Sequence, residues 1–179
     1  MLEVELKIRI ASPDGIREAL GRRNAEPRGR VHEHDIYYNA PHRDFGITDE
    51  AVRVRYTDDH AVVTYKGPKM KNYTLKAREE LNFAVESGPA FETMLQRLGF
   101  TKTAEVNKWR ENYAMGDASI SLDTVEELGT FVEIEVIAGE DDTDPTTRIE
   151  KIAHDIGVNG EPILASYLEL LLEKRAAEK

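Results

Sequence analysis

The chain has 179 residues and no cysteine, 32% of its residues are charged and 40% are hydrophobic, and its formal net charge is −10. This composition is typical of one globular domain, expected over 1–179, and it excludes disulfides, thiolate metal sites and cysteine nucleophiles. The negative charge disfavours nucleic acid and anionic membranes as partners, and no apolar run approaches the ~18 residues of a membrane span. Glu3 and Glu5 interrupt any signal-peptide core, so we expect a soluble, cytoplasmic protein.

Two periodicities divide the chain into strands and helices. Alternating polar and apolar side chains indicate strands, and apolar stripes at helical spacing after Ser, Asp or Pro indicate helices. In chain order, the pattern predicts a strand over 2–10, a helix over 13–23, strands over 31–38, 51–56, 61–66 and 73–85, a helix over 88–98, strands over 106–114, 118–124 and 130–137, a helix over 145–156, and a last helix that begins at Pro162. The fold class is therefore α+β, rich in antiparallel strands.

Three polar segments leave alternatives open. The acidic loop 139–144 lacks the ligand spacing of an EF-hand, so a solvated loop is favoured over a calcium site. The basic turn 67–72 could act as a flap. His32 and His34 share a strand face, but without a third ligand we expect packing or surface roles rather than zinc binding.

The first strand carries charged groups on one face. Glu3, Glu5 and Lys7 alternate with Val4 and Leu6, so the three charged side chains point to the same side. Successive carboxylates on that side lie roughly 6–7 Å apart, a spacing at which they can share one cation or flank two. By itself, such a strand is also typical of the solvated face of an antiparallel sheet.

The later strands repeat this alternation in the same phase. Eight strands suggest a closed barrel, because closure removes exposed edges. If the helices cover the apolar faces from outside, the charged faces point inward, and the lumen must be wet, ion-filled or built for a charged ligand. The alternative is an open sheet with one solvated charged face.

The inward face would have a net charge of +2, which contrasts with the acidic chain. Cations suit a polyphosphate, and clustered carboxylates suit the divalent metal ions that accompany it. The eight basic residues are Lys7, Arg53, Arg55, Lys66, Lys76, Arg78, Lys108 and Arg110, and the six acidic residues are Glu3, Glu5, Glu80, Asp123, Glu133 and Glu135.

Motifs in these strands resemble one known family. They are Glu3-x-Glu5-x-Lys7, His34-Asp35-Ile36-Tyr37-Tyr38, Ala51-Val52-Arg53-Val54-Arg55, Thr64-Tyr65-Lys66-Gly67-Pro68, Arg78-Glu79-Glu80, Lys108-Trp109-Arg110, and the pair Leu122-Asp123 and Gly129-Thr130-Phe131-Val132-Glu133-Ile134-Glu135. In this order and phase they resemble the CYTH superfamily, also called triphosphate tunnel metalloenzymes; Ser166-Tyr167 matches a common Ser-Tyr near the family's carboxyl end. The resemblance covers nearly the whole chain and implies a closed eight-stranded antiparallel β-barrel with helices packed on its outside.

The resemblance also implies roles for individual residues. Metal ligands for Mg²⁺ or Mn²⁺ would be Glu3, Glu5, Glu133 and Glu135, with Asp123 and Glu80 assisting or holding the basic groups in place. The substrate-binding residues would be Lys7, Arg53, Arg55, Lys66, Arg78, Lys108, Arg110 and Tyr37, and the residues expected to be catalytic are Glu3, Glu5, Lys7 and Arg110.

Three of the neighbouring residues have competing interpretations. Arg78 could bind phosphate or pair with Glu80, and Lys76 is expected to be solvated near a strand entrance. For Tyr38 we expect a packing role.

Several reactions fit the same tunnel. The family resemblance favours a class IV adenylyl cyclase that converts ATP to cyclic AMP and pyrophosphate. The alternatives are hydrolysis of inorganic tripolyphosphate or thiamine triphosphate, and a non-catalytic polyphosphate or nucleotide-binding protein. No motif indicates an adenine pocket. The Leu-rich carboxyl-terminal helix could close the outside of the tunnel or meet a partner in a homodimer.

Overall fold

The structure is a computed structural model that describes residues 2–58, 60–71, 74–139 and 144–178. The strands are β1 (Leu2–Arg9), β2 (Glu26–Asn39), β3 (Ala51–Thr57), β4 (His60–Lys66), β5 (Lys76–Val85), β6 (Thr101–Met115), β7 (Ala118–Val125) and β8 (Gly129–Ala138). The helices are α1 (Asp14–Arg22), α2 (Phe45–Thr48), α3 (Gly88–Arg97), α4 (Pro145–Asp155) and α5 (Tyr167–Ala177).

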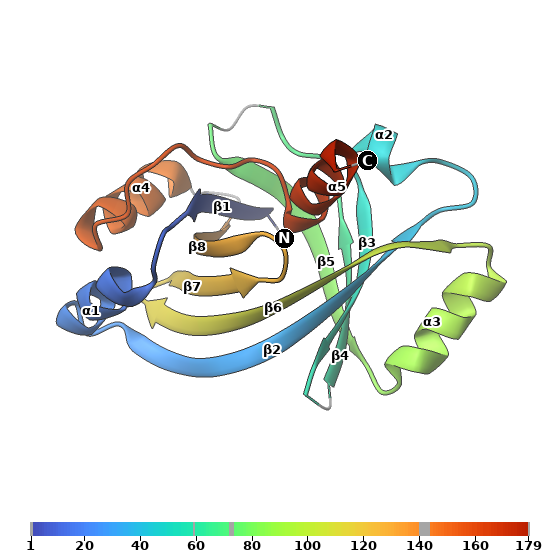
Figure 1. Cartoon of the computed structure of the whole chain (residues 1–179), viewed down its shortest axis with the longest axis horizontal. Coiled ribbons are helices and arrows are strands. Elements are labelled where there is room, and N and C mark those ends of the chain that lie inside the picture. Colours follow the sequence, from blue (N-terminus) through green and yellow to red (C-terminus); the bar gives the residue numbers. More distant parts are fainter. Residues whose placement is uncertain (1, 59, 72–73, 140–143, 179) are drawn as a thin grey trace.

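All eight strands form one closed antiparallel barrel, in the order β1-β5-β4-β3-β2-β6-β7-β8 (Figure 1). β1 closes it by pairing with β5 on one side and with β8 on the other. The long strands β2 and β6 pair over most of their length and curve across the molecule (Figure 1). The predicted closed barrel is therefore confirmed, and the alternative of an open sheet is wrong.

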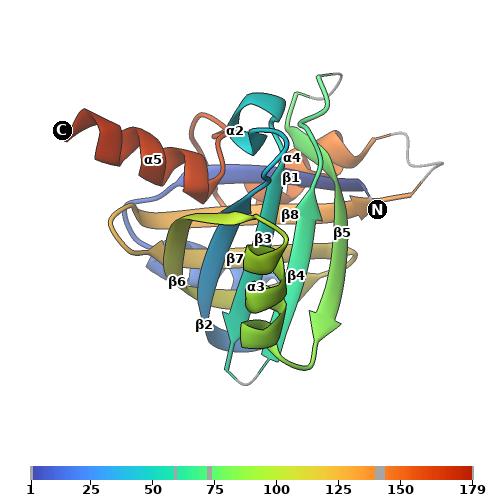
Figure 2. The same cartoon turned by 90° about the vertical axis from the view of Figure 1, so that its right-hand side faces the viewer.

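The helices cover the apolar outer faces of the strands. α1 and α4 lie at one end of the molecule and α3 lies in front of β3 and β4 (Figures 1 and 2). Val4 and Ile134 belong to a buried cluster with Leu20 of α1 and Ile149 of α4, all 0% exposed. Because the apolar side chains are buried between strands and helices, the polar side chains of the same strands point into the barrel.

The last helix begins later than its sequence pattern predicts. Pro162 does not open a helix, because the backbone N–H of Ile163 donates to the Lys7 carbonyl at 2.8 Å and this segment runs beside β1. Ser166 instead caps α5: its hydroxyl accepts from the N–H of Glu169, whose carboxylate accepts from the N–H of Ser166. This reciprocal capping box is a strong start signal, and it overrides the proline four residues earlier.

Other differences concern element lengths. β2 and β6 are longer than predicted, and the four-residue helix α2, capped by the Asp44 side chain, has too little periodicity to be found in the sequence. The predicted strand over 73–85 begins at Lys76; residue 73 of that prediction and residue 72 of the expected flap lie outside the described residues. The same is true of 140–143 in the acidic loop. None of the described helices is long and apolar enough to cross a membrane.

Candidate active site

A charged cavity, called here the tunnel, fills the inside of the barrel. All eight basic residues predicted for the inward face line it, together with five of the six predicted carboxylates. Asp35, Tyr37, Ala51, Ser166 and Tyr167 complete the wall, and Asp35 was not counted among the inward charges from the sequence. The sixth predicted carboxylate, Asp123, lies behind the wall and is 0% exposed.

Carboxylates from β1 and β8 lie side by side in one part of the tunnel. Glu5 pairs with Glu135 across the two strands, and Glu133 is opposite Lys7. Burial and the nearby charges of Glu3 and Glu5 raise the pKa of Glu135 to about 8. Burial also raises the pKa of Glu3. These groups therefore retain protons more readily than ordinary carboxylates, as expected where negative charges crowd together out of water.

Glu5 differs from these neighbours because two lysines hold it. Burial opposes its ionisation, but Lys7 at 3.1 Å and Lys76 at 2.8 Å outweigh burial and hold the pKa of Glu5 well below its ordinary value. Lys76 is only 6% exposed, so the expectation that it is solvated is wrong. The reason is the register of the barrel, which places Lys76 directly opposite Glu5 in the β1–β5 pair.

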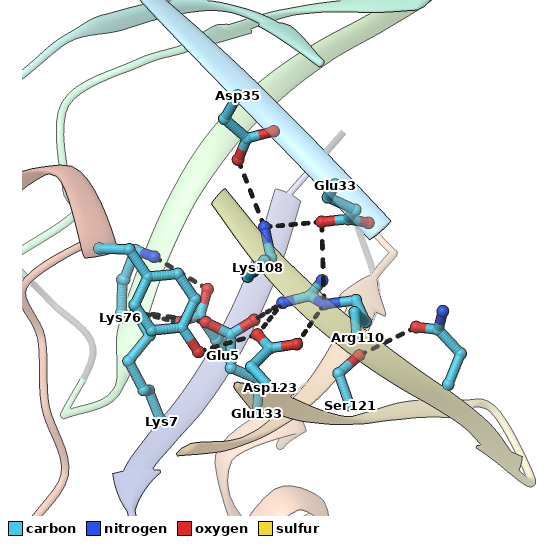
Figure 3. A network of polar contacts seen from close by, with 12 residues as sticks. Glu5, Lys7, Glu33, Asp35, Lys76, Lys108, Arg110, Ser121, Asp123 and Glu133 are labelled. Carbon is cyan, nitrogen blue, oxygen red and sulfur yellow. Dashed lines mark hydrogen bonds and ion pairs between the residues drawn. The ribbon is translucent and has the colours of Figure 1, made fainter. Parts of the chain in front are cut away.

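A second cluster joins β2, β3 and β6, and Figure 3 shows its members from β2 and β6, which are Glu33, Asp35 and Lys108. The Lys108 ammonium lies 2.6 Å from Glu33 and 3.3 Å from Asp35. Arg55 donates two hydrogen bonds to Asp35, at 2.6 and 2.8 Å, and lies 2.9 Å from Glu33. Sequence reasoning missed Glu33 and did not count Asp35 as an inward charge, although both alternate with Tyr37 on β2 and could have been found by the same period of two.

Arg110 is held by a fork-to-fork pair with Asp123 (Figure 3). Its Nε and terminal nitrogen donate to the two carboxylate oxygens at 2.7 and 2.5 Å, and it also bonds to Glu133. The hydroxyl of Tyr167 donates to Asp123 at 2.8 Å. Asp123 therefore orients Arg110, and it accepts hydrogen bonds from both Arg110 and Tyr167. This fits the predicted alternative in which Asp123 holds a basic group in place.

Tyr167 also contacts the lysines of the tunnel. Its ring lies 4.5 Å from the Lys7 ammonium and 5.8 Å from that of Lys108, within the range of cation–π attraction. Lys7 further donates to the Ala165 carbonyl at 3.1 Å. The segment that leads into α5 thus forms part of the tunnel wall.

Lys66 and Glu80 form an ion pair and lie directly opposite each other in the β4–β5 ladder. Burial, reinforced by the positive charge of Arg53, lowers the pKa of Lys66 to about 8. Glu80 forms its ion pair with Lys66, and Arg78 forms an ion pair with Asp49 at 3.2 Å. The predicted alternative of an Arg78–Glu80 pair is therefore wrong.

His32 and His34 are not among the residues that line the tunnel. His34 contacts Glu105 at 2.6 Å, and His32 packs on Trp109 with ring centroids 5.0 Å apart. These contacts confirm the packing and surface roles expected for them. Tyr38 is 2% exposed and donates to Glu92, which fits its predicted packing role.

The carboxylates have the donor chemistry of a site for hard divalent cations. Oxygen ligands suit Mg²⁺ and Mn²⁺, and one oxygen of Glu5 is buried without a hydrogen bond, its closest cation being Lys7. Over the described part of the chain, no three acidic or histidine side chains are already gathered as a ligand set. Glu3, Glu5, Glu133 and Glu135 could hold a cation, with lysines now neutralising part of their charge.

A closed barrel with a charged tunnel and this order of motifs defines a family. The CYTH domain matches residues 1–165, and the chain belongs to this family. It is 38% identical over 135 residues to a Methanocaldococcus jannaschii protein named as a candidate adenylate cyclase, covering 75% of this chain and 77% of the relative.

Solved structures share the fold. The PH1819 protein from Pyrococcus horikoshii has a TM-score of 0.83 and 39% identity, covering 97% of this chain and 99% of that one. A Hippeastrum protein, described as a candidate adenylyl cyclase with a dominant triphosphatase activity, has a TM-score of 0.73 and 16% identity, covering 97% and 95%. At that identity, the second likeness concerns the fold alone.

Proposed function

We propose that this protein is a metal-dependent enzyme that acts on a triphosphate inside the tunnel, and that its reaction is the conversion of ATP to cyclic AMP and pyrophosphate. One observation carries the proposal: eight basic side chains line a single cavity together with clustered carboxylates. The 38% identity to a relative named as a candidate adenylate cyclase supports the choice of ATP.

The basic residues would bind the phosphates. Arginine offers a planar fork for two oxygens of one phosphate, whereas lysine acts as a point charge. Arg55 and Arg110 are already oriented by bidentate carboxylate pairs, so little side-chain ordering remains when a substrate enters. Burial raises the pKa of Tyr37 to about 12, so its hydroxyl stays protonated and can donate to a phosphate oxygen.

The carboxylates of β1 and β8 would hold Mg²⁺ or Mn²⁺. Such an ion, when bound, neutralises phosphate oxygens and lowers the pKa of the attacking hydroxyl. Glu3, Glu5, Glu133 and Glu135 would be its ligands, and the raised pKa of Glu135 reflects the crowding that a cation relieves. Glu80 and Asp123 would keep Lys66 and Arg110 in place.

In the proposed reaction, the ribose 3′-oxygen forms a bond to the α-phosphorus while the bond from that phosphorus to the bridging oxygen of the β-phosphate breaks. The hydroxyl proton passes to solvent and pyrophosphate leaves. Lys7 and Arg110, which approach Glu133 from two sides, would stabilise the charge that develops on the phosphate oxygens.

Hydrolysis of the terminal phosphate is the second candidate, because a protein of the same fold is described as having a dominant triphosphatase activity. A protein that only binds polyphosphate would need the cations but not the clustered carboxylates, so the acidic side chains favour an enzyme.

Product analysis tests the proposal. The purified protein is incubated with Mg²⁺ or Mn²⁺ and, in separate reactions, with ATP, tripolyphosphate or thiamine triphosphate. Cyclic AMP and pyrophosphate in equal amounts are the expected products from ATP. Orthophosphate from tripolyphosphate without any cyclic AMP would reject the cyclase in favour of the hydrolase, and survival of all three substrates would reject an enzyme.

A further inference from the structure

The carboxyl-terminal half of β5 has a free edge, called here the β5 edge. Residues 76–79 of β5 pair with β1, whereas residues 80–85 pair with β4 alone, and no described strand lies on their other side. In Figure 2 this half of β5 lies at the right-hand edge of the molecule, and α3 lies on the side away from that edge. Backbone N–H and C=O groups of alternate residues therefore point outward without a strand to pair with.

The side chains of this half of β5 are exposed on both faces of the strand. Leu81 and Phe83, on the outer face, are 51% and 50% exposed. Asn82 and Ala84, on the inner face, are exposed as well, whereas Lys76 on the same face is buried in the tunnel wall. β5 thus extends beyond the closed part of the barrel, and its end presents apolar side chains together with an open backbone edge.

Other free edges of the barrel are protected. β2 pairs only with β6 over residues 26–32, but this stretch contains Pro27 and two arginines, and proline and charged side chains keep natural edges from pairing further. The edge of β6 over residues 101–107 is covered by α5, whose Leu171 belongs to the same buried cluster as Val106.

The β5 edge lacks both kinds of protection. Residues 80–85 contain no proline, lysine or arginine. Their one charged side chain, Glu80, points into the tunnel and is paired with Lys66, so it does not guard the edge. An unguarded edge with apolar side chains is a template for a further strand.

We propose that the β5 edge pairs with the same edge of a second copy of the chain, antiparallel and about a twofold axis at Asn82, so that two barrels form a homodimer. A second copy satisfies both free edges at once. This register places Leu81 of each copy opposite Phe83 of the other, and such aromatic–aliphatic pairs across strands are stabilising. Phe83 also contacts Phe91 of α3, with ring centroids 6.0 Å apart, so the helix extends the apolar surface.

The charges at the ends of the β5 edge favour this register over the next one. With the axis at Asn82, Glu80 of each copy lies opposite Ala84 of the other. An axis at Phe83 would place Glu80 opposite Glu86, and like charges directly opposite each other destabilise a sheet. The pairing at Asn82 also involves only residues of the free half of β5, so β1 keeps its place beside residues 76–79.

The oligomeric state tests the proposal. Sedimentation equilibrium over a range of concentrations should show a dimer of the wild type. Phe83→Lys places a charge on each of the two edges and should raise the dissociation constant of the dimer by ~tenfold or more. Leu172→Lys is the matched control, because Leu172 is 45% exposed and lies on α5, the other helix that could meet a partner. Melting curves verify folding, and Leu81→Lys replaces Phe83→Lys if that variant unfolds.

An introduced cysteine tests the register. The chain has no cysteine, so Asn82→Cys adds a single thiol to each copy. The axis places the two thiols on Cα atoms ~4.5–5.5 Å apart, within the range of a disulfide. In the control Ala84→Cys, the two positions lie four residues apart along the strands, roughly 13 Å. After oxidation, Asn82→Cys should migrate as a covalent dimer on a denaturing gel without reductant, and Ala84→Cys should migrate as a monomer.

Three results would overturn the proposal. The first is a wild type that stays monomeric at every concentration. The second is a dimer that persists in Phe83→Lys and dissociates in Leu172→Lys, which would place the interface on α5. The third is equal cross-linking of Asn82→Cys and Ala84→Cys, which would show that the thiols meet by random collision rather than across a fixed twofold axis.

Discussion

Replacement of Glu33 by glutamine should destabilise the fold markedly, because this carboxylate balances buried cations on β3 and β6. Glu33 lies 2.6 Å from Lys108 and 2.9 Å from Arg55, and its side chain is 8% exposed. Burial opposes its ionisation, but the charges of Arg55, Arg110 and Lys108 outweigh burial and lower its pKa from 4.5 to about 2. Such a shift corresponds to about 3 kcal/mol of folding free energy at neutral pH, in line with the ~3–5 kcal/mol for breaking a buried pair.

The dependence on pH follows from the direction of this shift. A carboxylate whose pKa is lower in the folded state stabilises the fold above the pKa of the unfolded chain, and it loses that effect as the pH falls through its folded pKa. The difference in unfolding free energy between wild type and Glu33→Gln should therefore be largest at pH 7 and decrease to about 1 kcal/mol near pH 3.

Urea unfolding at a series of pH values measures this difference. Glu111→Gln is the matched control, because Glu111 also pairs with an arginine, Arg17, but the two side chains are 24% and 41% exposed. For such a pair the expected loss is under ~1 kcal/mol. A loss for Glu33→Gln no greater than that of the control, or a loss that grows as the pH falls, would show that Glu33 does not stabilise the fold by balancing the buried cations.

Two further predictions concern charged residues of the tunnel, and a third concerns the cap of α5. Glu5→Gln should abolish metal-dependent turnover and still bind tripolyphosphate without metal; unchanged turnover would exclude Glu5 as a metal ligand. Because the pKa of Lys66 is about 8, the free protein loses this charge above that pH, and its affinity for tripolyphosphate should fall by up to ~tenfold per pH unit there. Lys66→Arg should flatten this pH profile in calorimetry, and an equal slope in both proteins would exclude Lys66 as the cause. Ser166→Ala removes the α5 capping box and should cost ~1 kcal/mol in urea unfolding, whereas unchanged stability would show that the cap contributes nothing.

Much of the barrel could be predicted because its strands alternate so regularly. The period of two identifies which side chains point inward, and all eight predicted basic residues line the tunnel. Alternation cannot say which charges pair, since pairing depends on strand order and register. The structure places Lys76 opposite Glu5 and Lys66 opposite Glu80. Arg78 forms its ion pair with Asp49.

The cavity beneath α2 and α5, which Phe45 and Leu172 help to line, could not be predicted from the sequence for another reason. Its walls come from α2 and α5, which are far apart in the chain, and α2 is a single turn without a periodic pattern. The start of α5 was also predicted too early, because Pro162 resembles a first helical residue, although Ser166 and Glu169 carry the Ser-x-x-Glu pattern of a capping box in the sequence itself. The cavity walls, in contrast, depend on how separate helices pack, which the sequence pattern does not give.

The central claim is that the tunnel binds a triphosphate together with a divalent cation on the carboxylates of β1 and β8. Anomalous diffraction from crystals grown with Mn²⁺ and tripolyphosphate tests it directly, because the anomalous signal of manganese distinguishes this ion from water and from lighter cations. We expect a manganese peak among Glu3, Glu5, Glu133 and Glu135, with phosphate density against Arg53, Arg55, Lys66, Lys108 and Arg110. Manganese and phosphate found only outside the tunnel would contradict it.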